Sequence, residues 1–573
     1  MDRCLSIPEI LHLIFCDIEK ESRSEREKYR TLLSAASVSH AWSQVALDYL
    51  WRSICGVHCL IRCMPNLWTI VDRELILTRS LKASDLHVLE KYTPRVRTLI
   101  VGSSGPIVPL WVYQALLLSS QHPLLPNLEV LEWRPSSDQV NYFPFVRSFM
   151  ASGLKDLELV VNFKEYDQVS FLTIVPRLCP NITRLCLGMT GYRDTLAVGV
   201  ENFSDIFHDW HNLTTLVVTD LTLDGLVCVA AMSSLRSLEI QRAKCLWKSS
   251  LSGDKDPTRL LNALESLNPP FPALQSLEIT TRMPVAIVTN LLALLRNAEL
   301  IRLTVSVDSI TDTVDDLAKL FLVLAEHCDH GSLKKIIFGH SNPRVIFPFL
   351  VLQPLLQFSA LQYIDIELSP AAIGLTVSEN QMLQMVSAWP DIRVLRITPD
   401  AGRNLNSPTT LLALLPIIKC TKLRHLGLSL DATDAAARRV LRDPGRPKGQ
   451  RNYTLRTLDV GIGSPISHKE FVAKFLSESF PNLDDIASDG SPDSSTTRRW
   501  RYVARVLLPL LGGNQMECGN MGFEGAVGRT ANPVKGSARE WAEKVEKMDG
   551  DWSDPEIIRA NLATPDIDSD WFD

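Results

Sequence analysis

The sequence is poor in cysteine and has no apolar run long enough to cross a membrane. Twelve cysteines stand among 573 residues, a share of about 2% that is far below that of a secreted protein held together by disulfides. A membrane-spanning helix needs about 20 consecutive apolar residues, and the most apolar stretch, Val345–Phe358, is interrupted by Pro348 and Pro354. The N-terminus has no basic segment followed by an apolar run, so we expect no secretory signal. We therefore expect a protein of the cytoplasm, the nucleus or both, with no membrane partner.

The sequence also lacks a dominant charge. Its 59 basic and 65 acidic residues give a net charge of −6, so we expect no nucleic acid as a partner. Hydrophobic residues make up 46% and charged residues 22% of the chain, which excludes a largely disordered protein. A chain of this length is expected to form several domains or one long array of repeats.

One short pattern recurs through the middle of the chain. An apolar residue is followed by two variable residues, a second apolar residue, one variable residue and a third apolar residue. The fourth and sixth positions of this pattern point to one face of a strand, because side chains alternate along a strand. The pattern starts at fourteen positions, about 30 residues apart on average: Val96, Leu128, Leu154, Ile182, Leu213, Leu235, Leu274, Leu300, Leu333, Leu361, Ile392, Leu423, Leu455 and Leu483.

Amphipathic helices are predicted between these strands. Capping boxes at Ser378–Gln381 and Ser467–Glu470 begin two of them, and Asp256-Pro257 opens another. Residues 313–328 carry apolar side chains at helical spacing. A strand and a helix in every unit of about 30 residues predict an α/β solenoid, in which each unit buries its apolar face against its neighbours.

These units resemble leucine-rich repeats over roughly residues 90–490. Fourteen copies favour this interpretation over an unrelated α/β domain with leucine-rich strands. The resemblance implies an irregular solenoid with a concave sheet face that binds a protein substrate. The side chains that we expect to form this recognition surface are charged: Glu129, Lys155, Glu158, Arg236, Glu239, Glu278, Arg302, Arg393, Arg396 and Arg456.

Residues 1–52 have no such repeat and are predicted to form three helices. Leu11, Ile14 and Phe15 share one helical face, and a charged stretch at residues 19–30 separates them from a second helical region at 32–51. A bundle of about 50 residues is marginally stable alone. Such a unit often completes its core on a partner.

The N-terminal residues resemble an F-box. The matching residues are Ile7-Pro8, Glu9-Ile10-Leu11, Ile14-Phe15, Val38-Ser39, Trp42 and Leu50-Trp51-Arg52. This resemblance implies that the bundle docks on the SKP adaptor of a cullin-RING ubiquitin ligase. It assigns the adaptor contact to Ile7, Pro8, Ile10, Leu11, Ile14, Val38, Ser39 and Trp42.

Together the two resemblances imply a substrate-recognition subunit of an SCF-type ligase, which has no catalytic residues and no cofactor of its own. Two alternatives remain open. The chain could be a leucine-rich-repeat scaffold outside the ubiquitin system, with its first helices serving only as a cap. It could also be an enzyme with an unrecognised site.

Three cysteines and a histidine just after the N-terminal helices are spaced like possible metal ligands. Cys55, Cys59 and Cys63 recur every fourth residue with His58 between them, so a helix would place the three thiols on one face. No Cys-x-x-Cys pair accompanies them, and buried cysteine often acts as a small hydrophobic residue. We therefore expect no metal.

These patterns divide the chain into five segments. They are an F-box-like helical domain (1–52), a helical linker or cap (53–90), the solenoid (91–487), a linker and C-terminal cap region (488–548) and an acidic tail (549–573). The tail holds eight acidic residues and one arginine, and a disordered tail is the preferred interpretation over one that binds a basic partner or folds back on the solenoid. The basic loop at 443–451 is predicted to be a solvated insertion.

Overall fold

The fold is given by a computed structural model. It describes residues 7–21, 25–64, 66–102, 105–119, 123–134, 137–161, 165–189, 206–243, 270–295, 298–343, 347–369, 377–399, 409–433, 451–461, 464–488 and 495–508. The expectations for Asp256-Pro257, for most of the loop at 443–451, for most of residues 488–548 and for the tail at 549–573 lie outside these described residues.

The described part of the chain is built on one open sheet of 15 strands, in the order β1-β4-β5 and onward to β17. All neighbours in this sheet are parallel. Each of the fourteen repeat starts is followed by one of these strands, so the predicted α/β solenoid of leucine-rich units is confirmed. The strands are β1 (Ser53–Ile54), β4 (Thr98–Val101), β5 (Val130–Trp133), β6 (Asp156–Val161), β7 (Arg184–Met189), β8 (Thr215–Val218), β9 (Ser237–Ile240), β10 (Ser276–Thr281), β11 (Arg302–Val307), β12 (Lys335–His340), β13 (Tyr363–Leu368), β14 (Val394–Pro399), β15 (His425–Leu428), β16 (Thr457–Asp459) and β17 (Asp485–Ala487).

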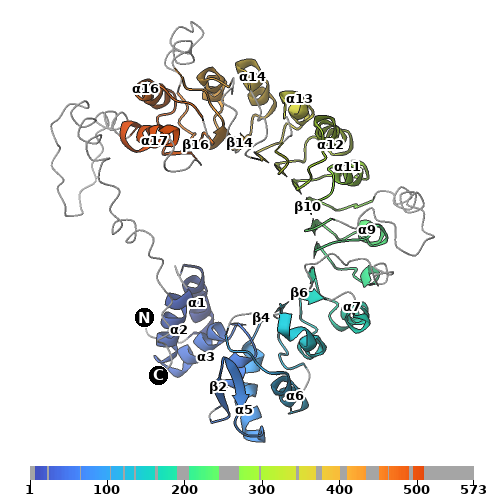
Figure 1. The fold of residues 1–573 in the computed structure, drawn as a ribbon. Helices are drawn as coiled ribbons and strands as arrows, with labels where there is room; N and C mark the ends of the chain where they lie inside the picture. Colours follow the sequence, from blue (N-terminus) through green and yellow to red (C-terminus); the bar gives the residue numbers. More distant parts are fainter. Residues whose placement is uncertain are drawn as a thin grey trace, which may run out of the picture.

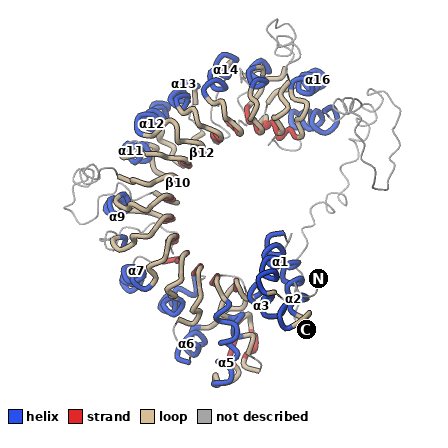
Figure 2. The backbone as a smooth tube through the Cα atoms, turned by 180° about the vertical axis from the view of Figure 1, so that it is seen from behind, coloured by secondary structure: helices blue, strands red, loops and turns tan. Residues whose placement is uncertain are grey.

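The units form an arc with the strands on its inner side and the helices on its outer side (Figures 1 and 2). Outer α-helices are α5 (Ala83–Tyr92), α6 (Leu110–Ser119), α7 (Tyr166–Leu178), α9 (Leu223–Ala230), α11 (Ala286–Ala293), α12 (Val314–His327), α13 (Phe349–Leu352), α14 (Glu379–Ala388), α16 (Lys469–Ser479) and α17 (Ser495–Tyr502). Five 3-10 helical segments replace or extend them: η2 (Thr93–Arg95), η3 (Ser137–Phe149), η4 (Gln353–Gln357), η5 (Leu411–Leu414) and η6 (Pro416–Lys419). The last turn, η7 (Val503–Leu507), is a π-helix.

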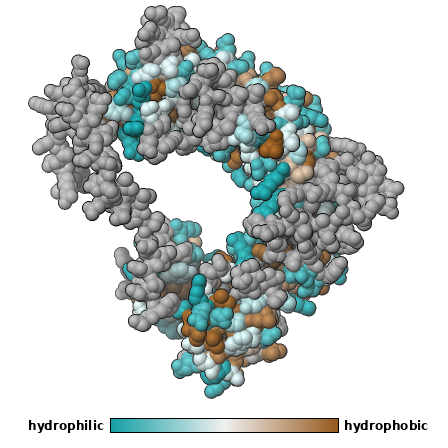
Figure 3. All heavy atoms as spheres, in the orientation of Figure 1, coloured by the Kyte–Doolittle hydropathy of each residue, from teal (hydrophilic) through white to brown (hydrophobic). Residues whose placement is uncertain are grey.

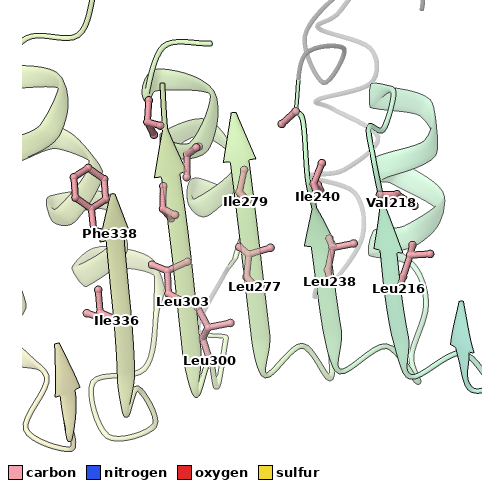
Figure 4. Close-up of a cluster of buried hydrophobic side chains, with 14 of the residues drawn as sticks. Leu216, Val218, Leu238, Ile240, Leu277, Ile279, Leu300, Leu303, Ile336 and Phe338 are labelled. Carbon is pink, nitrogen blue, oxygen red and sulfur yellow. The ribbon is translucent and has the colours of Figure 1, made fainter. Parts of the chain in front are cut away.

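Aligned rows of leucine, isoleucine and valine hold neighbouring units together. Leu277 of β10 lies opposite Leu303 of β11, and Ile279 lies opposite Val305. Figure 4 shows these rows continuing from Leu216 and Val218 of β8 to Ile336 and Phe338 of β12. Residues in these rows are at most a few per cent exposed, so each unit depends on its neighbours for burial.

One predicted helix start and one predicted helix are confirmed, and a second predicted start is wrong. Ser378 caps α14, since its side chain accepts from the Gln381 N–H and Gln381 bonds back to Ser378. Helix α12 spans the predicted segment and begins with a capping box at Thr313. The capping box predicted at Ser467 does not form, because α16 begins only at Lys469 and its N-cap, His468, makes no side-chain cap bond.

The segment 53–90 is not the helical linker that the sequence predicted. It contains the first strand of the sheet, the short helix α4 (His58–Ile61), a hairpin of β2 (Trp68–Val71) and β3 (Glu74–Leu77), and α5. The hairpin turn consists of Asp72 and Arg73, both with positive φ (49° and 67°). Two residues with positive φ suit a tight hairpin turn. The hairpin was not predicted because Asp-Arg is not the Asn-Gly pair that usually indicates such a turn.

The first three helices form a bundle with a core of its own. They are α1 (Pro8–Glu21), α2 (Glu25–Ala36) and α3 (His40–Leu50). Its buried members are Leu11, Phe15, Leu32, Ala35, Val45, Ala46 and Tyr49, which form a cluster separate from that of the solenoid. Among the described residues, no helix is both long and apolar enough to span a membrane.

Candidate protein-binding surfaces

The structure divides the predicted adaptor contacts between the surface and the core of the bundle. Val38 is 64% exposed and Ile7 41% exposed, and Pro8 is exposed beside Ile7. Ile10, Ile14 and Trp42 are half-buried.

Leu11 is completely buried and packs in the bundle core, so its assignment to the contact surface is corrected. The reason lies in the helical period: Leu11 shares the face of Phe15, four residues later, and that face points inward.

Ser39 and Trp42 hold the bundle together. Ser39 is the N-cap of α3, and its Oγ accepts a hydrogen bond from the backbone N–H of Trp42 at 3.3 Å. The Trp42 ring meets the Phe15 ring edge-on, with the centroids 5.6 Å apart. Substitution of either residue would therefore disturb the bundle itself as well as its surface.

Two exposed leucines on the bundle were missed by the sequence analysis. Leu13 is 68% exposed and Leu33 is 61% exposed. Leu13 follows Ile10 by three residues, so both lie on the same side of α1. The signal was present in the sequence, since each leucine interrupts the polar side of an amphipathic helix.

The bundle is fixed to the first units of the solenoid. Helix α3 is followed after two residues by β1, and the Trp51 ring packs 4.5 Å from the Tyr92 ring. The Arg95 guanidinium donates to the Gln44 carbonyl at 3.0 Å and to the Gln44 side chain at 2.7 Å, and it pairs with Asp48. These contacts orient the bundle relative to the arc.

The predicted substrate-binding residues fall into two groups. Glu158, Glu239, Glu278, Arg302 and Arg396 lie on strands, at positions that alternate with the buried rows. Their side chains therefore face the inner side of the arc. Hydrophilic residues are visible on that side in the space-filling view (Figure 3).

The other five residues precede the strands and lie along the edge where the strands begin: Glu129, Lys155, Arg236, Arg393 and Arg456. Their placement on concave strands is corrected. The backbone gives the reason, because the amides of Lys155 and Asp156 both donate to the carbonyl of Glu129, at 2.8 and 3.1 Å. The chain bends at this point before it enters the strand. Along the edge, the Lys155 ammonium pairs with the Glu129 carboxylate at 3.1 Å.

Ion pairs cover the N-terminal part of the concave face. The Arg134 guanidinium bonds the Glu158 carboxylate through two nitrogens, one of them at 2.6 Å, and Arg184 pairs with Asp156 at 2.8 Å. Cys186 lies on β7 between these charges. Burial, followed by the nearby Glu158 carboxylate, raises the pKa of Cys186 to about 12, so this thiol stays protonated at neutral pH.

Two glutamates stand side by side at the centre of the concave face. Glu239 and Glu278 are direct partners in the register of β9 and β10. Partial burial and the Glu239 charge raise the pKa of Glu278 above its usual range, while Arg302 and Lys335 oppose this shift. The Lys335 ammonium lies 4.4 Å from the centroid of the Tyr363 ring. This central region therefore offers both paired acids and adjacent cations to a partner.

The three cysteines do not lie on one face of a helix as the spacing predicted. Helix α4 begins at His58, so Cys55 lies in the turn after β1. The Sγ atoms of Cys55 and Cys59 are 3.9 Å apart, and the Cys59 Sγ is 3.5 Å from Nε2 of His58. Hydrogen bonds from Cys59 and then His58 lower the pKa of Cys55 to about 4, and the pKa of Cys59 is correspondingly raised. Cys63 is turned away and contacts the Cys59 carbonyl at 3.4 Å.

No protein-family model matches the sequence, and no curated protein sequence matches it. Among solved structures, the chain is similar to one in the yeast complex of Rad7 and Elc1, at 14% identity and a TM-score of 0.34, over 62% of this chain and 81% of that one. It is also similar to the leucine-rich-repeat-containing protein LegL7 from Legionella pneumophila, at 15% identity and a TM-score of 0.29, over 52% of this chain and 92% of that one. Both similarities are distant, and neither assigns a function or a partner.

Proposed function

We propose that this chain is the substrate-recognition subunit of an SCF-type cullin-RING ubiquitin ligase, acting in the cytoplasm or nucleus. The helical bundle binds the SKP adaptor, and the concave face of the solenoid binds a protein substrate. The associated ligase performs ubiquitin transfer, so the chain contributes no catalytic residue. Its action is to hold a substrate lysine at high effective concentration near the charged E2.

The exposed apolar side chains of the bundle carry this proposal. Leu13, Leu33 and Val38 are each more than 60% exposed on a unit that has only a small core of its own. Apolar residues concentrated on so small a unit are typical of a surface that a partner covers. Of these three residues, Val38 also belongs to the F-box resemblance.

The attachment of the bundle supports the same function. A substrate receptor has to present its substrate in a defined direction, and a bundle on a loose tether would not do so. Here the Arg95 contacts and the Trp51–Tyr92 ring contact join the bundle to the solenoid. The substrate surface, in turn, combines both charge signs on a rigid sheet, which suits recognition of a specific protein surface.

The test is capture of the purified full-length chain by purified SKP adaptor and cullin. We expect a stoichiometric complex. Val38→Glu should weaken it by at least about tenfold, because a charge buried in an apolar contact is costly. Leu350→Glu is the matched control, since Leu350 is 65% exposed on the distant helix α13 and should leave binding unchanged.

One result would overturn the proposal, and a second would exclude Val38 from the adaptor contact. If the folded wild-type chain fails to bind the adaptor, the bundle acts only as a cap and the chain is a leucine-rich-repeat scaffold. If the Val38 and Leu350 variants bind equally well, the adaptor contact does not include the exposed turn before α3. Far-UV circular dichroism of both variants would show that each has kept its fold.

A further inference from the structure

We propose that Cys55, His58 and Cys59 bind a zinc ion. Their ligand atoms all lie within 4.8 Å of one another, with Cys55 in the turn after β1 and His58 and Cys59 at the start of helix α4. Two thiolates and an imidazole are a ligand set that favours zinc among the common metals. This site is separate from the bundle surface and from the concave face described above.

The distances fit a tetrahedral ion. Zinc bonds sulfur at about 2.3 Å and nitrogen at about 2.0–2.1 Å, so tetrahedral angles place two sulfurs about 3.8 Å apart and a sulfur about 3.5 Å from a nitrogen. The Cys55 and Cys59 sulfurs are 3.9 Å apart, and the Cys59 sulfur is 3.5 Å from Nε2 of His58. These two separations match a tetrahedral ion, and the third, between the Cys55 sulfur and the imidazole, is at most 4.8 Å. A disulfide would instead require the two sulfurs to approach to about 2.05 Å.

Two glycines position the imidazole ring. A Cβ atom on Gly56 would lie 2.7 Å from Nδ1 of His58, and one on Gly105 would lie 2.6 Å from its Cε1. Both glycines also have positive φ, 133° and 87°. The ring is thus enclosed by two turns that only glycine accommodates, and His58 as a whole is 6% exposed. Such enclosure fixes the orientation of a ligand before the metal arrives.

The three residues supply three ligands, which leaves the fourth tetrahedral position to a water molecule. Cys55 is exposed, so solvent can reach this side of the cluster. Cys63 does not join the group. Within the described residues, the site lies beside β1, the edge strand of the sheet, which pairs with β4 on one side only. A zinc ion here would fasten the turn after β1 to α4 and so stabilise the end of the solenoid.

The test is metal binding by the full-length chain after reduction and removal of metals with a chelator. Titration with zinc alone, in competition with a chromophoric chelator, should show one tight site per chain. Cobalt should bind at the same place and give the thiolate charge-transfer and visible bands of a tetrahedral sulfur-ligated ion. Cys55→Ser and Cys59→Ser should each weaken zinc binding by at least about tenfold, the lower end of the loss seen even for indirect supports of a metal site.

Cys63→Ser is the matched control, because Cys63 lies one turn beyond Cys59 and outside the cluster. The affinity of the Cys63→Ser variant for zinc should equal that of the wild type. Zinc should also protect Cys55 and Cys59 of the wild-type chain from alkylation, with Cys63 unaffected, a result that does not depend on any variant folding. Absence of zinc binding by the reduced wild type, or equal losses in all three variants, would overturn the proposal.

Discussion

Arg396 reaches across an intervening strand to pair with Asp459. Its Nε donates to the Asp459 carboxylate at 3.1 Å, although Arg396 lies on β14 and Asp459 on β16. Between them, on β15, stands Gly427, which is the register partner of both residues. The guanidinium passes over this glycine. On the other side, the carboxylate of Asp365 on β13 lies 4.0 Å from a guanidinium nitrogen of Arg396. One arginine therefore links four consecutive strands of the concave face.

Gly427→Ala should break this link. A Cβ atom at residue 427 would lie 2.6 Å from Cγ of Arg396, closer than such atoms ever approach, so the arginine must withdraw. Asp459 is largely buried and would lose its cation. Hydrogen bonds to charged groups contribute about 1.5–3 kcal/mol, and we expect a loss of stability of about 1–2 kcal/mol, measured by urea unfolding.

Gly339→Ala is the control for that substitution. Gly339 also lies within a strand of the same sheet, but the nearest atom to its added Cβ is Ser306 Oγ at 3.5 Å, an ordinary contact. This variant should be neutral or slightly more stable, because alanine reduces the freedom of the unfolded chain. Equal destabilisation of the two variants would show that Arg396 is not the cause.

A buried pair, Asp312 and His340, should be among the most sensitive sites in the solenoid. The Asn342 N–H donates to Nδ1 of His340, so Nε2 carries the proton and donates to Asp312 at 3.1 Å. The second oxygen of Asp312 accepts the Val285 N–H at 3.0 Å. Both side chains are at most 1% exposed.

Asp312→Ala should therefore lower the free energy of unfolding by about 3 kcal/mol or more. It leaves two buried donors, the Val285 N–H and Nε2 of His340, without the carboxylate that accepts from them. Asp308→Ala is the matched comparison. Asp308 lies four residues earlier and is 61% exposed, with Ser341 and Arg282 as partners. Its loss should cost less than about 1 kcal/mol. Thermal unfolding of the two variants compares the loss of stability when a buried hydrogen-bonded carboxylate is removed with the loss when an exposed one is removed.

The solenoid could be predicted because its core is periodic in the sequence. A buried leucine or isoleucine at a fixed position in each unit, such as Leu277 or Ile336, is required by the neighbouring unit and so recurs along the chain. Strand β1 and the hairpin at Asp72-Arg73 could not be found in this way. They occur once, their strands have two to four residues, and no repeat supports them.

The candidate surfaces were only partly predictable for the same physical reason. Hydrophobic periodicity identifies the helices of the bundle, but it does not say whether Leu11 or Leu13 faces a partner, because packing against the other helices decides that. The edge position of Lys155 depends on a shared backbone carbonyl that no side-chain pattern records. The contact between Cys55 and His58 depends on the turn at Gly56, which brings two residues of different elements together.

Asp85 should make the stability of the N-terminal units depend on pH. Two nitrogens of Arg79 bond its carboxylate at 2.7 and 2.9 Å, and the Lys82 N–H bonds it at 2.8 Å. The Arg79 hydrogen bonds, followed by that of Lys82, lower the pKa of Asp85 to about 2. Because the pKa in the folded state is below the ordinary value, the stabilisation is complete above about pH 4 and is lost as the pH falls to about 2.

Asp85→Asn should remove this dependence. At about pH 6 the wild type should exceed the variant by about 1.5–3 kcal/mol, and the difference should shrink towards zero near pH 2. Urea unfolding followed by far-UV circular dichroism at several pH values measures both. Asp315→Asn, at an exposed position in the first turn of α12, is the comparison and should show no such convergence. A constant difference between wild type and Asp85→Asn would contradict the assignment.

Arg95 should determine how firmly the bundle is held against the solenoid. Its guanidinium bonds Gln44 twice and pairs with Asp48, all on α3. Arg95→Ala removes these bonds across a partly exposed contact, so we expect a loss of roughly 1 kcal/mol and about fivefold faster amide hydrogen exchange in α3. Arg177→Ala, which removes an exposed pair with Asp209 on a distant unit, should leave hydrogen exchange in α3 unchanged.

If the bundle binds the adaptor as proposed, the Arg95 variant should still bind the adaptor but support slower ubiquitin transfer, since different residues provide adaptor binding and the orientation of the bundle. Unchanged exchange in α3 would show that Arg95 does not hold the bundle in place.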